Sequence, residues 1–102
     1  MLCLPIIQRL YRKSLLGIQF PPIKTAGDVI IDGHHRYVSA LLAGIPIHCI
    51  PSVQTDAIVL VEWSKVIFDI NDWDTVAKIK LLNQQDARHN GLSVAALARL
   101  LE

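Results

Sequence analysis

The residues of this chain that could do chemistry gather in the segment 32–36, which is Asp-Gly-His-His-Arg. The β-branched run 29–31 precedes it, and a stretch typical of a helix follows it. The start of a helix leaves backbone N–H groups unpaired and carries a partial positive charge, so anions are favoured there. Arg36 adds a donor that can bind two phosphate oxygens, and two imidazoles add donors that titrate near neutral pH. This combination predicts a turn that binds phosphate.

Each residue of this segment has a chemical role at such a site. Gly33 lets the backbone approach a ligand closely and adopts angles that other residues resist. His34 or His35 could transfer a proton near neutral pH. Asp32, at the end of the preceding strand, could orient an imidazole or help to hold a divalent metal ion.

A purely structural interpretation of the same segment is equally open. Asp32 would cap the helix, Gly33 would make the turn, and the two histidines and Arg36 would be exposed residues of the first helical turn. A cation in the first turn, however, opposes the helix dipole by roughly several tenths of a kcal/mol. A bound anion would offset that cost, which favours the phosphate-binding interpretation.

The elements that must position this turn follow from the spacing of apolar residues, glycines and prolines. Strands 22–24 and 29–31 are predicted to form a hairpin through the turn 25–28, and helix 34–43 is predicted to end at Gly44. The other predicted helices are 5–16, 75–87 and 94–101. Another strand is predicted at 46–50, and the segments 57–61 and 65–70 are rich in β-forming residues. Asp72 or Asp74 is expected to cap the third helix and Ser93 the fourth.

Composition indicates one folded domain with apolar surface to cover. The 102 residues are 52% apolar with a mean hydropathy of +0.38, so we expect a single α+β domain spanning 1–102, with a motif core at 21–53 and a helical part at 72–102. A protein partner, a second copy or a missing part of a longer chain would explain the high apolar content. The net charge of +1 gives no support for general nucleic-acid affinity.

The sequence also favours a cytoplasmic chain. No apolar segment is long enough to span a bilayer, and the basic residues near the N-terminus follow the apolar run, the reverse of a secretory signal. Cys3 and Cys49 have no Cys-x-x-Cys spacing and do not make a disulfide framework. We therefore expect no membrane association. Export as part of a larger secreted polypeptide stays an open alternative.

The stretch from Pro22 to Ile47 resembles the core of the ParB/sulfiredoxin superfamily. The shared pattern is a hairpin, then Asp-Gly-x-x-Arg opening a helix, then a glycine and a strand, and it covers a quarter to a third of the chain. The resemblance implies a small domain with a β-sheet core and peripheral helices. It also implies a nucleotide held by its phosphates, with Mg²⁺ and a nucleoside triphosphate as the expected cofactors. The phosphate-binding positions it implies are Gly33, His34, His35 and Arg36.

The departures from that superfamily narrow the function. His34 stands where sulfiredoxin has its catalytic cysteine, so sulfinate reduction is disfavoured. The segment 51–102 shows neither the second arginine motif nor the helix-turn-helix of partition proteins. The remaining expectation is a ParB-like nuclease or a nucleotide hydrolase, which could act as a toxin effector domain. His34 and His35 would be its catalytic residues, and Asp32 would support them. The alternative is a non-catalytic protein-interaction module.

Weaker patterns favour structural roles. His48, Cys49 and His89 could meet His34 or His35 around a zinc ion, but no pair has zinc-finger spacing, so a structural role is favoured and the identity of any metal stays unknown. We expect the aromatic residues and the acids of the second half to serve packing and capping, the basic residues of the first helix to form a solvated face, and the leucines of the last two helices to form core or a self-association face. These residues are Tyr37, Trp63 and Trp73; Glu62, Asp69, Asp72 and Asp74; Arg9, Arg12 and Lys13; and Leu81, Leu82, Leu97, Leu100 and Leu101.

Overall fold

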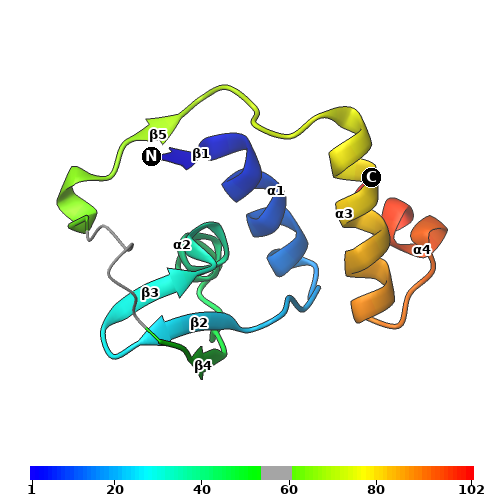
Figure 1. Cartoon of the computed structure of the whole chain (residues 1–102). Helices are drawn as coiled ribbons and strands as arrows, with labels where there is room; N and C mark the ends of the chain where they lie inside the picture. Colours follow the sequence, from blue (N-terminus) through cyan, green and yellow to red (C-terminus); the bar gives the residue numbers. More distant parts are fainter. Residues whose placement is uncertain (54–60) are drawn as a thin grey trace.

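The computed structural model describes residues 1–53 and 61–102 and shows an α+β arrangement of helices around two small sheets (Figure 1). The elements, in chain order, are β1 Leu2–Cys3, α1 Leu4–Leu15, β2 Ile23–Ala26, β3 Val29–Asp32, α2 His34–Ala43, β4 Cys49–Pro51, a 3₁₀ helix Trp63–Lys65, β5 Phe68–Asp69, α3 Val76–His89 and α4 Val94–Leu100. The predicted β-rich segment 57–61 lies, apart from its last residue, outside the described residues.

The predicted hairpin is confirmed and belongs to a three-stranded mixed sheet. β2 pairs antiparallel with β3 and parallel with β4, in the order β3-β2-β4. Gly27 makes the tight turn between the first two strands with a φ of 59°, which glycine adopts without a steric cost. β3 therefore ends at Asp32, immediately before α2 begins.

A second sheet joins the N-terminus to the middle of the chain. β1 pairs parallel with β5, with Leu2 opposite Phe68 and Cys3 opposite Asp69. The sequence did not predict this pair, because two-residue strands have no periodicity to detect. The pair places the N-terminus beside the segment that leads to α3 (Figure 1).

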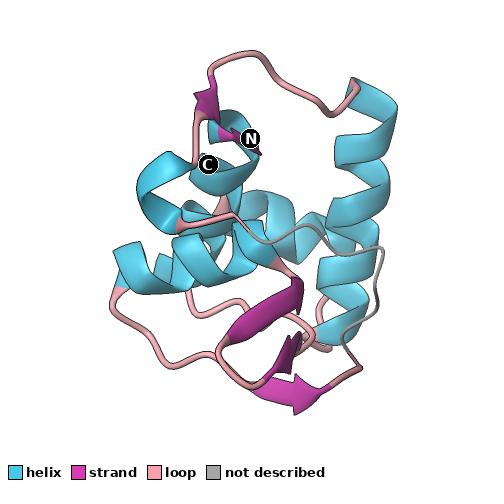
Figure 2. Ribbon diagram, turned by 60° about the vertical axis from the view of Figure 1, so that its left-hand side comes forward, coloured by secondary structure: helices cyan, strands magenta, loops and turns pink. Residues whose placement is uncertain are grey.

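Helix α1 begins with Pro5 in its first turn, as predicted, and packs along α2 (Figure 2). Ile7 and Ala40 are buried between these helices. The Ser39 hydroxyl lies there too, and it donates to the carbonyl of His35 in its own helix and contacts the carbonyl of Ile7 in α1. Burial of the polar Ser39 side chain is thus compensated by hydrogen bonds.

The strands supply less of the core than the sequence predicted. Among the buried apolar side chains of the described residues, Leu2, Cys3 and Ile23 are the ones that come from strands. The others come from helices and, in the case of Ile18, from the segment after α1, because strands of two to four residues offer few positions on one face. A separate cluster of Ile18, Ala87 and Leu97, with Phe20, Leu92 and Leu101 packed against it, joins the segment after α1 to α3 and α4.

Several predicted details are wrong. Thr75, and not Asp72 or Asp74, caps α3, by accepting from the Lys78 N–H at 3.1 Å, because both carboxylates face Arg9 instead. The strand expected at 46–50 begins later and covers Cys49–Pro51. The segment 65–70, predicted only to be rich in β-forming residues, contains the two-residue strand β5. Ser93 caps α4 as predicted.

The described residues leave much apolar surface exposed. Phe68 in β5 and Ile67 just before it are 48% and 63% exposed, and Leu41 and Leu42 at the end of α2 are each 63% exposed. Patches of this kind mark contact surfaces when they are contiguous. None of the helices in the described ranges combines the length and the apolar content needed to cross a bilayer.

Candidate functional site

The turn between β3 and α2 is fixed by Gly33. This residue is the N-cap of α2 and lies in the left-handed region, with φ 99° and ψ 30°. A Cβ placed on Gly33 would lie 2.5 Å from Cγ2 of Ile23, a buried residue of β2. Both the backbone conformation and the packing therefore require glycine here. The tight turn expected from the Asp-Gly step is confirmed, and its reason lies in packing as well as in backbone freedom.

The first turn of α2 has no side-chain cap, so the Asp32 cap of the structural interpretation is wrong. The Tyr37 N–H donates to the Gly33 carbonyl at 2.9 Å and begins the helical ladder. Within the described residues, the N–H groups of residues 34–36 have no hydrogen-bond acceptor. Three backbone donors thus meet at the positive end of the helix dipole.

Arg36, in the first turn of α2, links this turn to the segment before β2 and to the end of β3. Its Nη1 donates to the carbonyl of Pro21 at 2.9 Å and contacts that of Pro22 at 3.3 Å, while Nη2 lies 3.4 Å from Oδ2 of Asp32. The Asp32 side chain is 62% exposed, so this long ion pair is weak. The carbonyls orient the guanidinium without neutralising it, and among residues 1–53 and 61–102 Asp32 is the one carboxylate paired with it.

His35 is engaged in holding the N-terminus. Its Nε2 accepts a hydrogen bond from the Cys3 N–H at 2.9 Å, and its ring meets Trp73 edge to face, with ring centroids 5.6 Å apart. An imidazole that accepts at Nε2 is neutral, with its proton on Nδ1. Burial, and then the neighbouring His34, lower the pKa of His35, while Asp74 acts in the opposite direction.

His34 has different surroundings. Its side chain is exposed, and its ring centroid lies 6.4 Å from that of Trp63. Trp63 in turn stacks on Tyr37, with centroids 5.5 Å apart and an angle of 28° between the rings. The aromatic residues contact one another and the site residues, while Trp63 stays 48% exposed.

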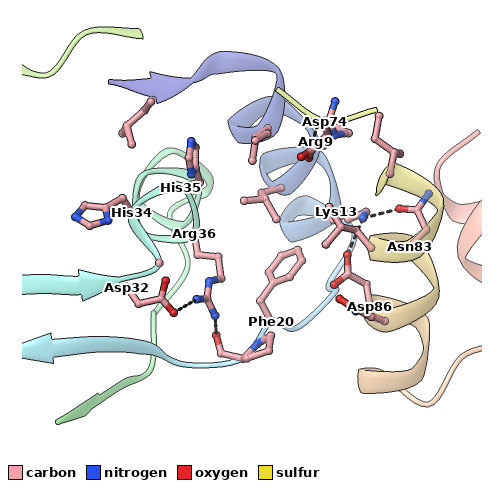
Figure 3. A pocket seen from close by; sticks show the side chains of 18 of the residues that line it. Arg9, Lys13, Phe20, Asp32, His34, His35, Arg36, Asp74, Asn83 and Asp86 are labelled. Atoms are coloured by element: carbon pink, nitrogen blue, oxygen red, sulfur yellow. Dashed lines mark hydrogen bonds and ion pairs between the residues drawn. The ribbon is translucent and has the colours of Figure 1, made fainter. Parts of the chain in front are cut away.

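The structure brings Asp32 and Arg36 together and does not bring the two imidazoles together with Arg36. The side chains of His34, His35 and Arg36 leave the turn in three directions (Figure 3). They nevertheless line one open cavity of about 590 Å³, which we call the trough. One wall is the segment 32–36, the floor is α1, and the opposite wall is α3.

The sequence missed the polar group on the α3 wall. Lys13, expected on a solvated face, is only 5% exposed, and its Nζ donates to Oδ1 of Asn83 and to Oδ2 of Asp86, both at 2.7 Å. Arg9, expected on the same face, pairs with Asp72 and Asp74 at the rim. No local signal could have found these pairs, because the partners lie more than sixty residues apart.

Metal-ligand chemistry has little support beyond the turn. In the ranges 1–53 and 61–102, no group of three or more His, Cys, Asp or Glu side chains is placed to hold a metal ion. Both cysteines are free thiols, Cys3 buried and Cys49 exposed. Asp32 is the carboxylate nearest to the unpaired amides along the chain.

Comparison of the chain with models of protein families, with curated proteins and with solved structures finds no match.

Proposed function

We propose that the start of α2 binds the phosphate group of a nucleotide or a nucleic acid. The observation that carries this proposal is the uncapped first turn at the wall of the trough. Three N–H groups without acceptors among the described residues are available to phosphate oxygens, and the helix dipole favours negative charge at this end. The cationic Arg36 lies in the same turn.

Arg36 supplies the charge that a phosphate requires. Its guanidinium is always protonated, and it has five N–H donors, of which the Pro21 and Pro22 carbonyls use those on Nη1. The contact to Asp32 is long, so a phosphate oxygen can compete with this carboxylate for Nη2. Preoriented charged donors of this type bind and stabilise phosphoryl groups.

Mg²⁺ fits the same turn through Asp32. Magnesium is commonly held in proteins by one or two carboxylates together with phosphate oxygens and water. The exposed carboxylate of Asp32 is the residue that would hold the ion. The ion would neutralise charge on the phosphate, while Arg36 and the amides of α2 position it.

Beyond binding, we propose that the site cleaves phosphoester bonds, as a nuclease or a nucleotide hydrolase. Such an activity would also suit a toxin effector domain. His34 is exposed and lines the trough, so it would transfer the proton. The Nε2 of His35 is already used by the Cys3 N–H, so His35 would support the turn, reaching a substrate only if that bond opened. The ParB/sulfiredoxin resemblance supports this chemistry by analogy of motif.

A second candidate is a non-catalytic interaction module. The exposed apolar residues beside β5 and at the end of α2 support it, because a protein partner or a second copy would bury them. In this case the turn would be retained for its structure, which Gly33 and Ile23 already require.

Calorimetric titration with inorganic tripolyphosphate, a nucleoside triphosphate and a short DNA, each with Mg²⁺, tests the proposal. We expect Arg36→Ala to weaken phosphate binding by roughly tenfold or more. The matched control is Arg88→Ala, an exposed arginine of α3 that does not line the trough. Hydrolysis of substrate by the wild type and not by His34→Ala would support catalysis. If the wild type binds none of the three ligands, the interaction module is favoured.

A further inference from the structure

Helices α1 and α2 end in the same backbone motif. Gly17 after α1 and Gly44 after α2 both lie in the left-handed region, with φ of 84° and 67°. An isoleucine, Ile18 or Ile45, follows each glycine, and its N–H donates to the carbonyl five residues earlier, at 3.1 Å in both cases. An apolar contact of the residue after the glycine frequently accompanies this motif. The backbone of both isoleucines is therefore fixed at the helix end.

The two helix ends differ in what covers them. Ile18 is 3% exposed, because Ala87 of α3 and Leu97 of α4 pack against it. Ile45 is 36% exposed, and Leu42, one turn before it, is 63% exposed. Within residues 1–53 and 61–102, no buried cluster like that at Ile18 covers the end of α2. The helices α3 and α4 thus complete the first motif and leave the second open.

The open surface spans the ends of both helices. Leu15 at the end of α1 is 59% exposed, and Leu41 beside Leu42 is 63% exposed. The two ends lie together, because Ser14 and Ile45 line the same small cavity. We call Leu15, Leu41, Leu42 and Ile45 the helix-end patch.

No charged residue interrupts the sequence that forms the helix-end patch. The ranges 14–23 and 37–55 contain no Asp, Glu, Lys or Arg, in a chain that is 19% charged. A partner recognised through ion pairs would need charged residues here. At a two-fold axis each residue meets its own copy, so a charge there would face a like charge. The composition of the patch therefore fits a second copy of the same surface better than a charged partner.

The chain exposes enough area to supply such an interface. Its accessible surface is 7071 Å², whereas a folded monomer of 11.4 kDa exposes about 5,800 Å². Its radius of gyration is 14.4 Å, against about 12.8 Å for a compact domain of this length. The excess of about 1,300 Å² is larger than the roughly 800 Å² that each partner contributes to an interface of standard size. Association with a second copy would bring the exposed area per chain close to the usual value.

From these features we infer that the chain forms a symmetric dimer in which the helix-end patch packs against its own copy. The contact is made by side chains and not by strand pairing, because the edge strand β4 has three residues and includes Pro51, which has no N–H to donate. The patch lies at the opposite end of α2 from the turn 32–36, roughly 15 Å along a helix of ten residues. This inference is therefore independent of the proposed phosphate site.

Sedimentation equilibrium of the full chain tests this inference. We expect the mass of two chains at roughly 100 μM, a concentration at which an interface of standard size is occupied. Leu42→Glu should weaken the dimer by roughly hundredfold or more, because the charge enters the interface twice. Leu81→Glu is the matched control, since Leu81 of α3 is 45% exposed and lies outside the patch, and it should leave the dimer unchanged. Circular dichroism and melting curves establish that both variants are folded.

A mixture of two variants separates loss of the contact from loss of folding. Leu42→Glu and Leu42→Lys should each dissociate the dimer. Their mixture should form a heterodimer roughly tenfold more tightly than either variant pairs with itself, because the like charges across the two-fold axis become opposite charges. A mixture that associates no better than its components overturns the inference.

Three further outcomes overturn it. The wild type is one chain in mass at roughly 100 μM in the first, which would leave the patch to a different partner. In the second, the dimer dissociates at high salt, because an apolar contact is not screened whereas pairing through the charged residues of the trough would be. In the third, Phe68→Glu dissociates the dimer and Leu42→Glu does not, which would place the contact at β5.

The inference and the proposed function fail separately. Arg36→Ala should leave the dimer unchanged, and Leu42→Glu should bind tripolyphosphate as the wild type does. A dimer that binds no phosphate overturns the proposed function alone. A monomeric wild type that binds tripolyphosphate overturns the dimer alone.

Discussion

The two walls of the trough are held in place by different forces. The wall at residues 32–36 is fixed by backbone: a left-handed glycine, a hairpin ladder and the packing of α1 on α2. The wall at α3 is held to α1 largely by side chains, with Lys13 and Arg9 paired to acids and a small apolar cluster at the base. Substitutions that add bulk should therefore destabilise the first wall most, and substitutions that remove a charge should destabilise the second.

This difference indicates which binding groups of a small domain have a fixed position. Backbone conformation and buried packing cannot relax by more than a few tenths of an ångström, so the amides of α2 have one position. Long side chains that reach across a cavity can adopt several positions. They keep a single position only while their charged partners are present. The start of α2 is thus the rigid half of the candidate site.

The strongest test of the backbone wall is Gly33→Ala. We expect the free energy of unfolding to fall by about 3 kcal/mol, because a left-handed alanine and an overpacked Cβ each cost about 1–2 kcal/mol. Gly27→Ala is the control, since its φ is 59° and no atom of residues 1–53 or 61–102 lies within 4 Å of its Cβ position. Urea unfolding measures both. Equal losses in the two variants would mean that the contact with Ile23 imposes no constraint.

The matching test of the α3 wall is Lys13→Met. Removal of the cation leaves Asp86 and Asn83 without their shared partner in a mostly buried setting, and we expect a loss of about 2–3 kcal/mol in urea unfolding. The double variant Lys13→Met with Asp86→Leu should recover much of this loss. Lys80→Met, on an exposed position of α3, should change stability by less than about 0.5 kcal/mol. If Lys13→Met lowered stability as little as Lys80→Met does, charge pairing would not hold the α3 wall in place.

A smaller effect is expected at His35, where the backbone wall meets the N-terminus. His35→Phe removes the acceptor for the Cys3 N–H and should cost about 1–2 kcal/mol. His35→Gln can keep an acceptor there and should cost less. Thermal melting of both variants against the wild type measures the difference, and identical losses would show that the hydrogen bond contributes nothing.

The same histidine predicts a pH dependence. Burial lowers the pKa of His35 below 6.5, so the unfolded chain binds its proton first as the pH falls. The contribution of neutral His35 is therefore complete above pH 6.5 and is lost progressively as the pH falls through 6.5 toward the lower pKa of the folded state. Stability of His35→Gln should decline less over this interval. A wild type that gains stability on acidification through this interval would reverse the predicted sign.

The smallest effect should come from the rim of the α3 wall. Arg9 donates to Asp72 at 2.5 Å and to Asp74 at 3.0 Å, but its side chain is 27% exposed and salt screens such pairs. Arg9→Gln should therefore lower the melting temperature less than His35→Phe does, and the loss caused by Arg9→Gln should shrink further at high salt. The hydrogen bonds from Arg9 also lower the pKa of Asp72, so this contribution is present near neutral pH and is lost as the pH falls below 3.8.

The parts of the fold that the sequence predicted well share a local cause. The bounds of α2 and its end at Gly44 were predicted as they are observed, because glycines in the left-handed region and the spacing of apolar residues act over a few positions. The hairpin and the Ser93 cap follow from the same kind of preference. The cap of α3 was wrong, because a distant arginine draws both candidate carboxylates away from the helix.

The candidate site likewise has features that follow from local sequence and features that depend on distant contacts. The sequence by itself determined that Asp32 to Arg36 form a strand-to-helix turn with unpaired amides, since backbone preferences within that segment suffice. Only the tertiary structure decided that Lys13 is buried against Asp86, that His35 holds the N-terminus, and that a trough lies between α2 and α3. Those features depend on contacts between residues 32 to 73 positions apart, which no local pattern in the sequence encodes.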